Sequence, residues 1–408
     1  MEFQQFVALV VFLGVFVLFS TKLVHRAVAT LLGAAILAIA QGPESFVSGM
    51  VPEVLLVTAG LMVLGGFMKR SGLAEWLALK AAHAGNGRPG RILVLTGLLS
   101  FLLGAFLGPV AAVVLVLPVS LLLAVELDVP ALPFVVVLSW TSLLGGATTL
   151  TAQPSNLWVA AALGIDAITW VTRMVPFTVS ALVLTLATGT LVFRKALRVT
   201  NERRARVLEY DASRSLEDRA LLTRTLTVLI AVVVGLVAGP WVGLTPTVVV
   251  VGGVVVLWLW EGSKSVDRSL SEIDVATLLF YGGLFSVVGA WGASDLSRVM
   301  AASLPPNPWL ALWGSATLGA FVDHGAVVGA LVPTLTAWGS TGVVWPFVVL
   351  GSSLGAGATV WGALSSATAL GLVGPGKRPD LGRFLKFGVL FLGLNLAVVS
   401  GLMFLLPH

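Results

Sequence analysis

Ten apolar segments, most of them close to the length that crosses a lipid bilayer, constrain the fold of this chain more than any other feature. An α-helix rises 1.5 Å per residue, so about 20 apolar residues span the hydrocarbon core. The segments are 4–20, 25–41, 52–68, 130–144 and 174–193, then 221–239, 246–260, 274–291, 345–354 and 384–405. Only 11% of the 408 residues are charged, against about 25% in soluble domains. We therefore predict an all-α polytopic membrane protein.

Two further apolar stretches, 92–125 and 308–337, are interrupted near their middle, at Gly104–Pro109 and at Gly319–Gly325. Each stretch could form two spans joined by a tight turn outside the membrane. Each could equally form a re-entrant hairpin whose tip stops inside the membrane. Composition and charge do not choose between the two.

The stretch Ser142–Leu163 gathers polar residues between long apolar runs. A helix does not continue through the Gly145-Gly146 pair and then Pro154, because glycine is entropically unfavourable there and proline lacks the N–H. At membrane depth, irregular backbone persists only when it is buried in protein or lines a watery cavity. The freed backbone groups and nearby hydroxyls therefore form a candidate site for a small solute or ion, and a polar loop outside the membrane is the alternative. The candidate residues here are Gly145, Gly146, Thr148, Thr149, Ser155 and Asn156.

The second half of the chain repeats these features in the same order. The anchors Gly60, Gly104 and Gly145 correspond to Gly283, Gly319 and Gly355 at offsets of 223, 215 and 210, and Thr149 and Ser155 correspond to Thr359 and Ser365. We predict a first repeat over 1–193, a linker over 194–220 and a second repeat over 221–408. Each repeat would contain five spans plus one hairpin, with helices broken at mid-membrane. An odd span number gives the halves opposite orientations, the inverted-repeat plan of many secondary transporters.

The basic residues indicate how the chain is oriented. With the N-terminus outside, 22 of the 24 Lys and Arg residues lie on the cytoplasmic side of an inner membrane, leaving Arg173 and Arg298 outside. This asymmetry is what the positive-inside rule requires. It also explains the net charge of +5 without a nucleic-acid partner. The 194–220 linker is predicted to be a solvated cytoplasmic connector, with contact to anionic lipid as the alternative.

Asp323 and His324, at the break of the second apolar stretch, are the strongest candidates for ion chemistry. A charge at the bilayer centre costs at least about 2.5–3.5 kcal/mol on insertion scales, so an acid retained there indicates function. Asp323 could bind a proton or sodium ion, and an imidazole can share a proton near neutral pH; a turn outside the membrane is the alternative. Glu53 and Asp274 are expected at interfaces. Trp158 could wall a cavity or pack between helices, and so could Trp361.

Several functions are disfavoured by what the sequence lacks. No cysteine is present and no GxxxxGK[ST] motif occurs, so we predict neither an enzyme nor a resident cofactor, and ATP-driven pumping would need a separate subunit. No Lys or Arg lies in the middle of any span, hairpin or broken segment. A small neutral hydroxylated solute or a cation is therefore expected in preference to a multiply charged anion, although helix N-termini attract anions.

The broken segments carry a family resemblance over essentially the whole chain. The sequence GGATTLTAQPSNL resembles the pattern GG-x-x-T-x-x-G-x-x-x-N of the ion transporter superfamily, with Ala152 in place of glycine. This superfamily includes divalent-anion/sodium symporters, citrate transporters, arsenite permeases and NhaD-type sodium/proton antiporters. The second segment, GAGATVWGALSS, has Ser366 where asparagine is usual. The Asp323-His324 tip is similar to the Asp-Asn tip of the arsenite and NhaD-type branches, whereas Gly108-Pro109 departs from both branches.

The resemblance implies ten spans and two re-entrant hairpins, often in a homodimer, with substrate and coupling ion (H⁺ or Na⁺) between hairpin tips and broken helices. It implies an arsenite-permease-like secondary transporter for a small inorganic oxyacid, with a sodium/proton antiporter and a dicarboxylate or sulfate symporter as alternatives. A channel or scaffold is the alternative from another class. Sodium would bind near Thr149, Ser155, Asn156 or Asp323. The implied half-sites are Gly108, Thr149, Ser155 and Asn156, and Asp323, His324, Thr359, Ser365 and Ser366.

The predicted orientation can be tested with a single engineered cysteine, because the chain has none of its own. A thiol introduced as Ala205→Cys should react with a membrane-impermeant reagent in everted vesicles and stay unlabelled in intact cells. Labelling from outside intact cells would overturn the orientation.

Overall fold

Helices make up every regular element of the described chain. The computed structural model describes residues 3–20, 24–44, 50–209, 218–339, 344–374 and 379–405. The first half contains α1 (Phe3–Ser20), α2 (Arg26–Gln41), α4 (Pro52–Arg70), α5 (Leu73–Ala84), α6 (Pro89–Leu107), α7 (Pro109–Glu126), α8 (Leu132–Thr148), α9 (Pro154–Leu163) and α10 (Ala167–Val192). Among the described helices, seven are long and apolar enough to cross a membrane. The prediction of an all-α polytopic membrane protein is confirmed.

The second half follows the same order of long and short helices. A linker helix, α11 (Asn201–Leu208), precedes it. The second half contains α12 (Arg219–Ala238), the short 3₁₀ turn η2 (Gly239–Val242), α13 (Pro246–Glu261), α14 (Ser263–Leu270), α15 (Val275–Gly292), α16 (Asp295–Ser303), α17 (Pro308–Phe321), α18 (His324–Trp338), α19 (Trp345–Ala358), α20 (Leu364–Leu372) and α21 (Leu381–Leu405).

The predicted segments match these helices closely, and α10 is the largest difference. It begins at Ala167 rather than at 174. Asp166 caps its first turn, because its carboxylate accepts hydrogen bonds from the Thr169 backbone N–H and hydroxyl, both at 2.8 Å. Such a cap satisfies the orphan donors of a helix start, so the helix extends past the apolar run that the sequence displays.

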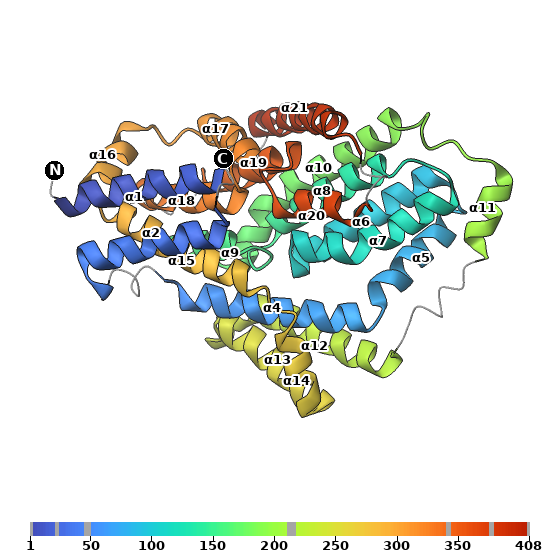
Figure 1. The fold of residues 1–408 in the computed structure, drawn as a ribbon, viewed down its shortest axis with the longest axis horizontal. Coiled ribbons are helices and arrows are strands. Elements are labelled where there is room, and N and C mark those ends of the chain that lie inside the picture. The colour runs from blue at the N-terminus through green and yellow to red at the C-terminus, as the bar shows by residue number, and fades with distance from the viewer. Residues whose placement is uncertain are drawn as a thin grey trace.

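Both interrupted stretches form helical hairpins. Gly108 turns the chain between α6 and α7 at φ +89°, a conformation that favours glycine. Val322 and Asp323 turn it between α17 and α18. The two hairpins approach the centre of the molecule from opposite ends (Figure 1). That they re-enter the membrane stays a prediction.

The two halves hold their hairpins by equivalent contacts. Gly145 on α8 lies against the backbone of α6 at the Phe101 carbonyl, and Gly355 on α19 lies against α17 at the Ala316 carbonyl, so a methyl group at either glycine would collide with backbone. Where α8 and α19 end, the Thr149 hydroxyl donates to the Ala105 carbonyl and the Thr359 hydroxyl donates to the Ala320 carbonyl.

The halves are interleaved through their third long helices. Helix α4 of the first half packs against α12 and α13, while α15 of the second half packs against α1 and α2. Gly60 faces Val250 across the first contact, and Gly283 faces the backbone of Thr30 across the second. The predicted boundaries therefore separate the two repeats in the sequence, but helices of each repeat pack against helices of the other. Opposite insertion of the halves stays a prediction.

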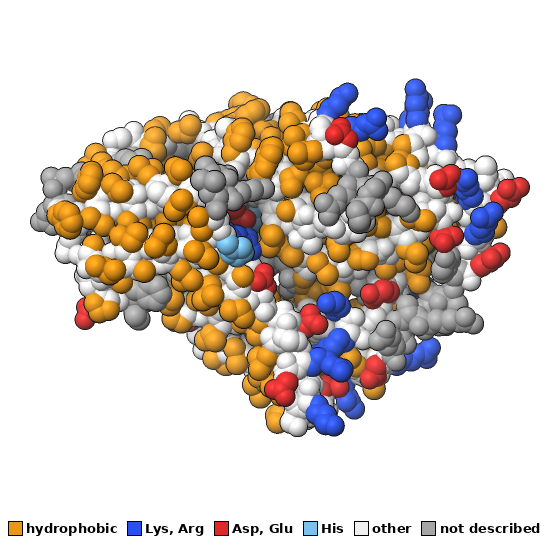
Figure 2. Space-filling view, in the orientation of Figure 1, with side chains coloured by type: hydrophobic (Ala, Val, Ile, Leu, Met, Phe, Trp, Pro, Cys, Tyr) orange, Lys and Arg blue, Asp and Glu red, His pale blue; other side chains and the backbone are white. Residues whose placement is uncertain are grey.

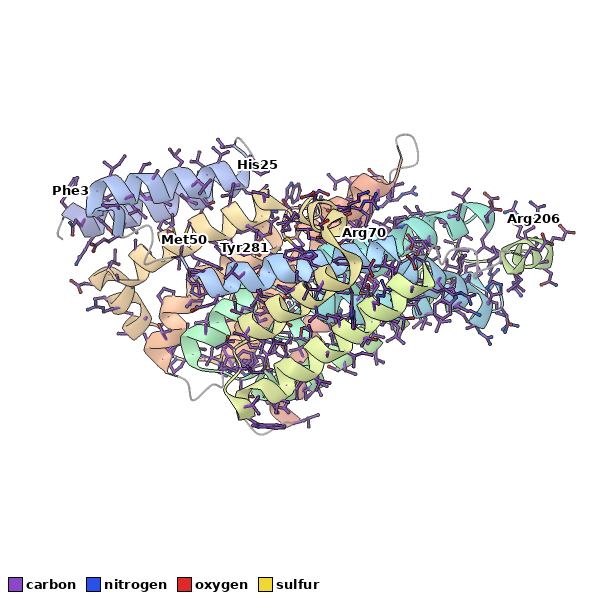
Figure 3. The ribbon with its side chains drawn as sticks, turned by 90° about the horizontal axis from the view of Figure 1, so that it is seen from below. Phe3, His25, Met50, Arg70, Arg206 and Tyr281 are labelled. Carbon is purple, nitrogen blue, oxygen red and sulfur yellow. The ribbon has the colours of Figure 1, made fainter. Side chains whose placement is uncertain are left out.

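Part of the predicted connector is helical, and this mostly exposed helix contacts the rest of the protein at a few points. In α11 Val207 is fully buried, Arg203 pairs with Asp128 after α7, and His83 Nε2 lies 3.2 Å from the Leu208 carbonyl oxygen. Arg206 on this helix lies at the far end from Phe3 (Figure 3). Charged side chains gather at this end and over α14, while most of the remaining face is apolar (Figure 2). Residues 210–217 of the linker, with Lys22, Lys377 and Arg378, lie outside the described residues.

The close approach at Gly145 predicts a sharp size limit. Gly145→Ala should destabilise the protein by about 1–3 kcal/mol, because the added methyl group overpacks α8 against α6 backbone. Gly393→Ala on α21 is the matched control, since nothing lies within 4 Å of its new methyl group. Thermal unfolding in detergent measures both variants, and equal midpoints would contradict the packing role.

Candidate functional site

Both hairpin tips and both helix breaks border one cavity of about 250 Å³. The first hairpin contributes Gly108 and Pro109, and the second contributes Asp323 and His324. Residues 151–154 of the first break and Leu364 and Ser365 beside the second complete its centre. The remaining lining comes from α4, from α7 and the last residue of α6, from residues 272–281 and from Arg26. Residues from both halves therefore form a single site.

Four helices begin at the hairpin tips and helix breaks that border this cavity. They are α7, α9, α18 and α20, and α9 and α20 lie near the centre of the fold (Figure 1). The first-turn N–H groups of a helix have no intrahelical partner, and each N-terminus carries about half a positive charge. Asp323 caps α18 by accepting from the Gly325 N–H at 3.0 Å. The starts of α7, α9 and α20 have no side-chain cap, so their dipoles are available to a negatively charged ligand.

His324 joins the second hairpin tip to both breaks. Its backbone N–H donates to the Gly362 carbonyl at 3.0 Å, and its Nε2 lies 2.6 Å from Gln153 Oε1. An amide oxygen only accepts hydrogen bonds, so His324 carries its hydrogen on Nε2 in this contact. One residue thereby ties its own half of the chain to the other.

Arg26 and Lys69 bring cationic side chains to the cavity from helix ends, although no Lys or Arg lies in the middle of a predicted span. The Arg26 guanidinium donates to Thr277 Oγ1 at 2.8 Å, lies 5.0 Å from the centre of the Phe280 ring and stands 3.9 Å from the Asp323 carboxylate. Arg26 opens α2, and this end of α2 lies at the cavity beside the second hairpin tip. The sequence places Arg26 at the end of a span and gives no sign of its partner on a distant hairpin.

Buried polar atoms without a hydrogen-bond partner cluster around the two breaks. They include Ser155 Oγ and Asn156 Oδ1 beside the first break, Ser365 Oγ and Ser366 Oγ beside the second, and Gln153 Nε2 and His324 Nδ1 where the halves meet. A buried polar group left unpaired costs about 1–3 kcal/mol. This concentration indicates a place where a ligand, ion or water completes the bonding.

The structure separates the predicted site residues into two groups. Gly108, Asp323, His324 and Ser365 line the cavity. The others lie behind it. Thr149 and Thr359 fasten the breaks to the hairpins, Gly145 and Gly355 permit close packing, and Gly146 makes room for the Gln153 amide and Pro109. Asn156 donates to the carbonyls of Gly146 and Thr149, each at 2.9 Å, and the Thr148 hydroxyl is used within α8.

The remaining candidate residues are two tryptophans and two acidic residues. Trp158 is buried against Phe285, with ring centres 4.3 Å apart, so it packs between helices, and Trp361 is 42% exposed. Glu53 is exposed at the start of α4, whereas Asp274 borders the cavity and accepts a hydrogen bond from the Thr277 hydroxyl. Among the described residues, no three His, Cys, Asp or Glu side chains form a metal-binding group.

Sequence reasoning missed Gln153, Arg26 and Tyr281 as members of the site. Gln153 stands inside the broken segment, so its position was a usable signal. Tyr281 follows Thr58 by 223 residues, the repeat offset of this region, and both side chains line the cavity. The Tyr281 hydroxyl also lies against Gly325 in the first turn of α18. For Arg26 the sequence offered no such signal.

Interrupted helices that meet at a central cavity are the architecture of a membrane transporter. The chain belongs to the family described as "Citrate transporter", which it matches over residues 16–355. It is 28% identical to the uncharacterized transporter Rv2684 of Mycobacterium tuberculosis, over 97% of this chain and 96% of that one. It is also 26% identical to the magnetosome protein MamN of Magnetospirillum gryphiswaldense, over 90% and 87% of the two chains.

Two solved structures share the fold. The YdaH transporter of Alcanivorax borkumensis superposes with a TM-score of 0.60 at 16% identity, covering 89% of this chain and 88% of that one. MtrF of Neisseria gonorrhoeae, described as illuminating a class of antimetabolite efflux pumps, also gives 0.60, at 11% identity and with 90% and 83% covered. At these identities the similarity concerns the fold alone.

The contact between the halves can be tested at Gln153. Gln153→Leu should destabilise the protein by about 1–3 kcal/mol, because the buried His324 Nε2–H loses its acceptor. Gln41→Leu is the matched control, since the Gln41 amide makes its 3.2 Å bond to the Gln4 carbonyl at the surface. Thermal unfolding in detergent compares the variants, and equal losses would contradict a special role for Gln153.

Proposed function

We propose that this protein is a secondary active transporter that couples a proton or sodium ion to movement of a small oxyacid or its anion. The observation that carries the proposal is the composition of the central cavity. Two basic side chains, Arg26 and Lys69, and three acidic ones, Glu272, Asp274 and Asp323, line it, so their formal charges sum to −1. The uncapped N-termini of α7, α9 and α20 add roughly +0.5 each.

This balance supports cation-coupled binding. With its carboxylate ionised, Asp323 opposes a second negative charge near the α18 N-terminus. A proton or sodium ion at Asp323 would remove that opposition and leave the helix dipoles and Arg26 to hold an oxygen-rich ligand. Binding of the two would then be mutually favourable, which is what coupling between two ligands means thermodynamically.

The presence of Arg26 changes the expected substrate. An uncharged acid such as arsenious acid can bond to the unpaired Ser365 hydroxyl, whereas an anion gains in addition from Arg26. Sodium/proton antiport at Asp323 is the second candidate, favoured by the net acidic lining. The family description, "Citrate transporter", makes citrate a necessary member of any substrate panel.

Uptake into proteoliposomes tests the proposal. Arsenite, citrate, succinate and sulfate are each offered under imposed pH and sodium gradients. We expect at least one solute to accumulate only when a gradient is present. Sodium-dependent collapse of a pH gradient with none of these solutes present would instead establish the antiporter.

Asp323→Asn separates coupling from binding. The variant should fold and still bind substrate, because asparagine can retain the cap on Gly325, but gradient-driven accumulation should be lost. Asp295→Asn is the control, since that carboxylate is 68% exposed on α16. Accumulation at the wild-type level by Asp323→Asn would remove Asp323 from the coupling mechanism.

A further inference from the structure

We propose that Arg26 is the substrate-anchoring cation of this site and that it holds a negatively charged oxygen of the substrate, a carboxylate or inorganic oxyanion. This inference rests on the proposed function and adds the charge of the substrate and the residue that recognises it. It depends on three features of Arg26: its fixed position, its incomplete pairing and the other residues that line the same cavity.

The guanidinium is held in place from the side of α15. Its donation to Thr277 Oγ1 fixes one nitrogen, and Asp274 accepts the Thr277 hydroxyl in turn. The Phe280 ring lies 5.0 Å away under the guanidinium carbon, a distance at which a cation is attracted to an aromatic face. A planar group positioned in this way presents its remaining N–H donors in a defined direction.

The pairing with Asp323 is too loose to use those donors. Arg–carboxylate pairs that form charge-assisted hydrogen bonds have distances of about 2.7–2.9 Å, whereas NH1 and Oδ2 are 3.9 Å apart here. One carboxylate oxygen of Asp323 already accepts a hydrogen bond from the Gly325 N–H. The two side chains are 21% and 14% exposed. A ligand oxygen can therefore approach Arg26 from the cavity without breaking a formed hydrogen bond.

Two other parts of the cavity lining suit an anion as well. The uncapped start of α20 carries Ser365, which lines the cavity while its Oγ has no partner and its side chain is almost fully buried. The uncapped start of α9 follows Gln153, whose Nε2 is also buried and unpartnered. An oxyanion with several oxygens could engage Arg26 and the Ser365 hydroxyl together.

The arrangement occurs in one half only. The helix corresponding to α2 is α13, which begins with Thr245 and Pro246, and the tip corresponding to Asp323-His324 is Gly108-Pro109. One anion per chain follows from this asymmetry.

Ligand-dependent thermal stability of the detergent-purified protein tests the proposal without requiring transport. The probes are citrate, succinate and sulfate, with arsenite at neutral pH as the uncharged comparison. We expect at least one anion to stabilise wild-type protein. Arg26→Gln should weaken that binding about 10- to 100-fold, the range for a charged hydrogen bond, and Arg26→Lys should recover part of it.

Further variants distinguish a loss of anion binding from a loss of folding. Arg26→Gln combined with Asp323→Asn removes both charges and avoids an unpaired buried carboxylate, and it should also fail to bind the anion. Asp323→Asn alone should bind the anion more tightly than wild type, because a competing charge is gone. Arg224→Gln should bind like wild type, because Arg224 pairs with Glu261 at 2.8 Å and neither residue lines the cavity.

Wild-type anion affinity in Arg26→Gln would overturn the proposal, and so would stabilisation of wild type by arsenite alone or by none of the probes. The proposed function fails separately. If the binding pattern holds but no gradient drives uptake, Arg26 keeps its role and coupled transport is refuted. If uptake occurs and Arg26→Gln leaves its KM unchanged, transport stands and Arg26 is refuted.

Discussion

The two hydrogen bonds of His324 connect the parts of this structure that matter for function. The backbone N–H fixes the second hairpin tip to the break between α19 and α20, and the imidazole fixes the same tip to the break between α8 and α9. Interrupted backbone cannot remain in an apolar interior unless its polar groups are satisfied. The site therefore exists because each break is covered by a hairpin, and His324 covers two breaks at once.

The same requirement explains the small residues that surround the breaks. A hairpin tip can reach a break only if the helices leading to it lie almost in backbone contact. Gly145 and Gly355 allow that approach, and Thr149 and Thr359 then donate to the carbonyls of the adjoining hairpin helices. What looks in the sequence like a ligand-binding set is thus partly a scaffold. The residues left to meet a solute are fewer and mostly asymmetric.

The two halves share nearly the same scaffold but differ in the residues that face the cavity. The first half offers a glycine and a proline at its tip, and the second offers an acid and a histidine, with Arg26 brought in from α2. Because α1 and α2 pack against α15, a residue from the start of the chain stands beside a tip near residue 323. Movement of α2 relative to the second hairpin would therefore alter the charge at the site, which is a physical route by which substrate binding and conformation can influence each other.

The sequence by itself determined the helical membrane class, nearly every helix, the positions of both breaks and the candidacy of Asp323 and His324. Those features are encoded locally, in apolar length, in Gly and Pro at the breaks, and in an acid where apolar residues surround it. Tertiary structure alone decided that α4 and α15 exchange partners between halves, that Gln153 meets His324, and that Arg26 reaches Asp323. Each of these joins residues about 170 or more positions apart, and no local pattern specifies which distant surfaces a helix will bury.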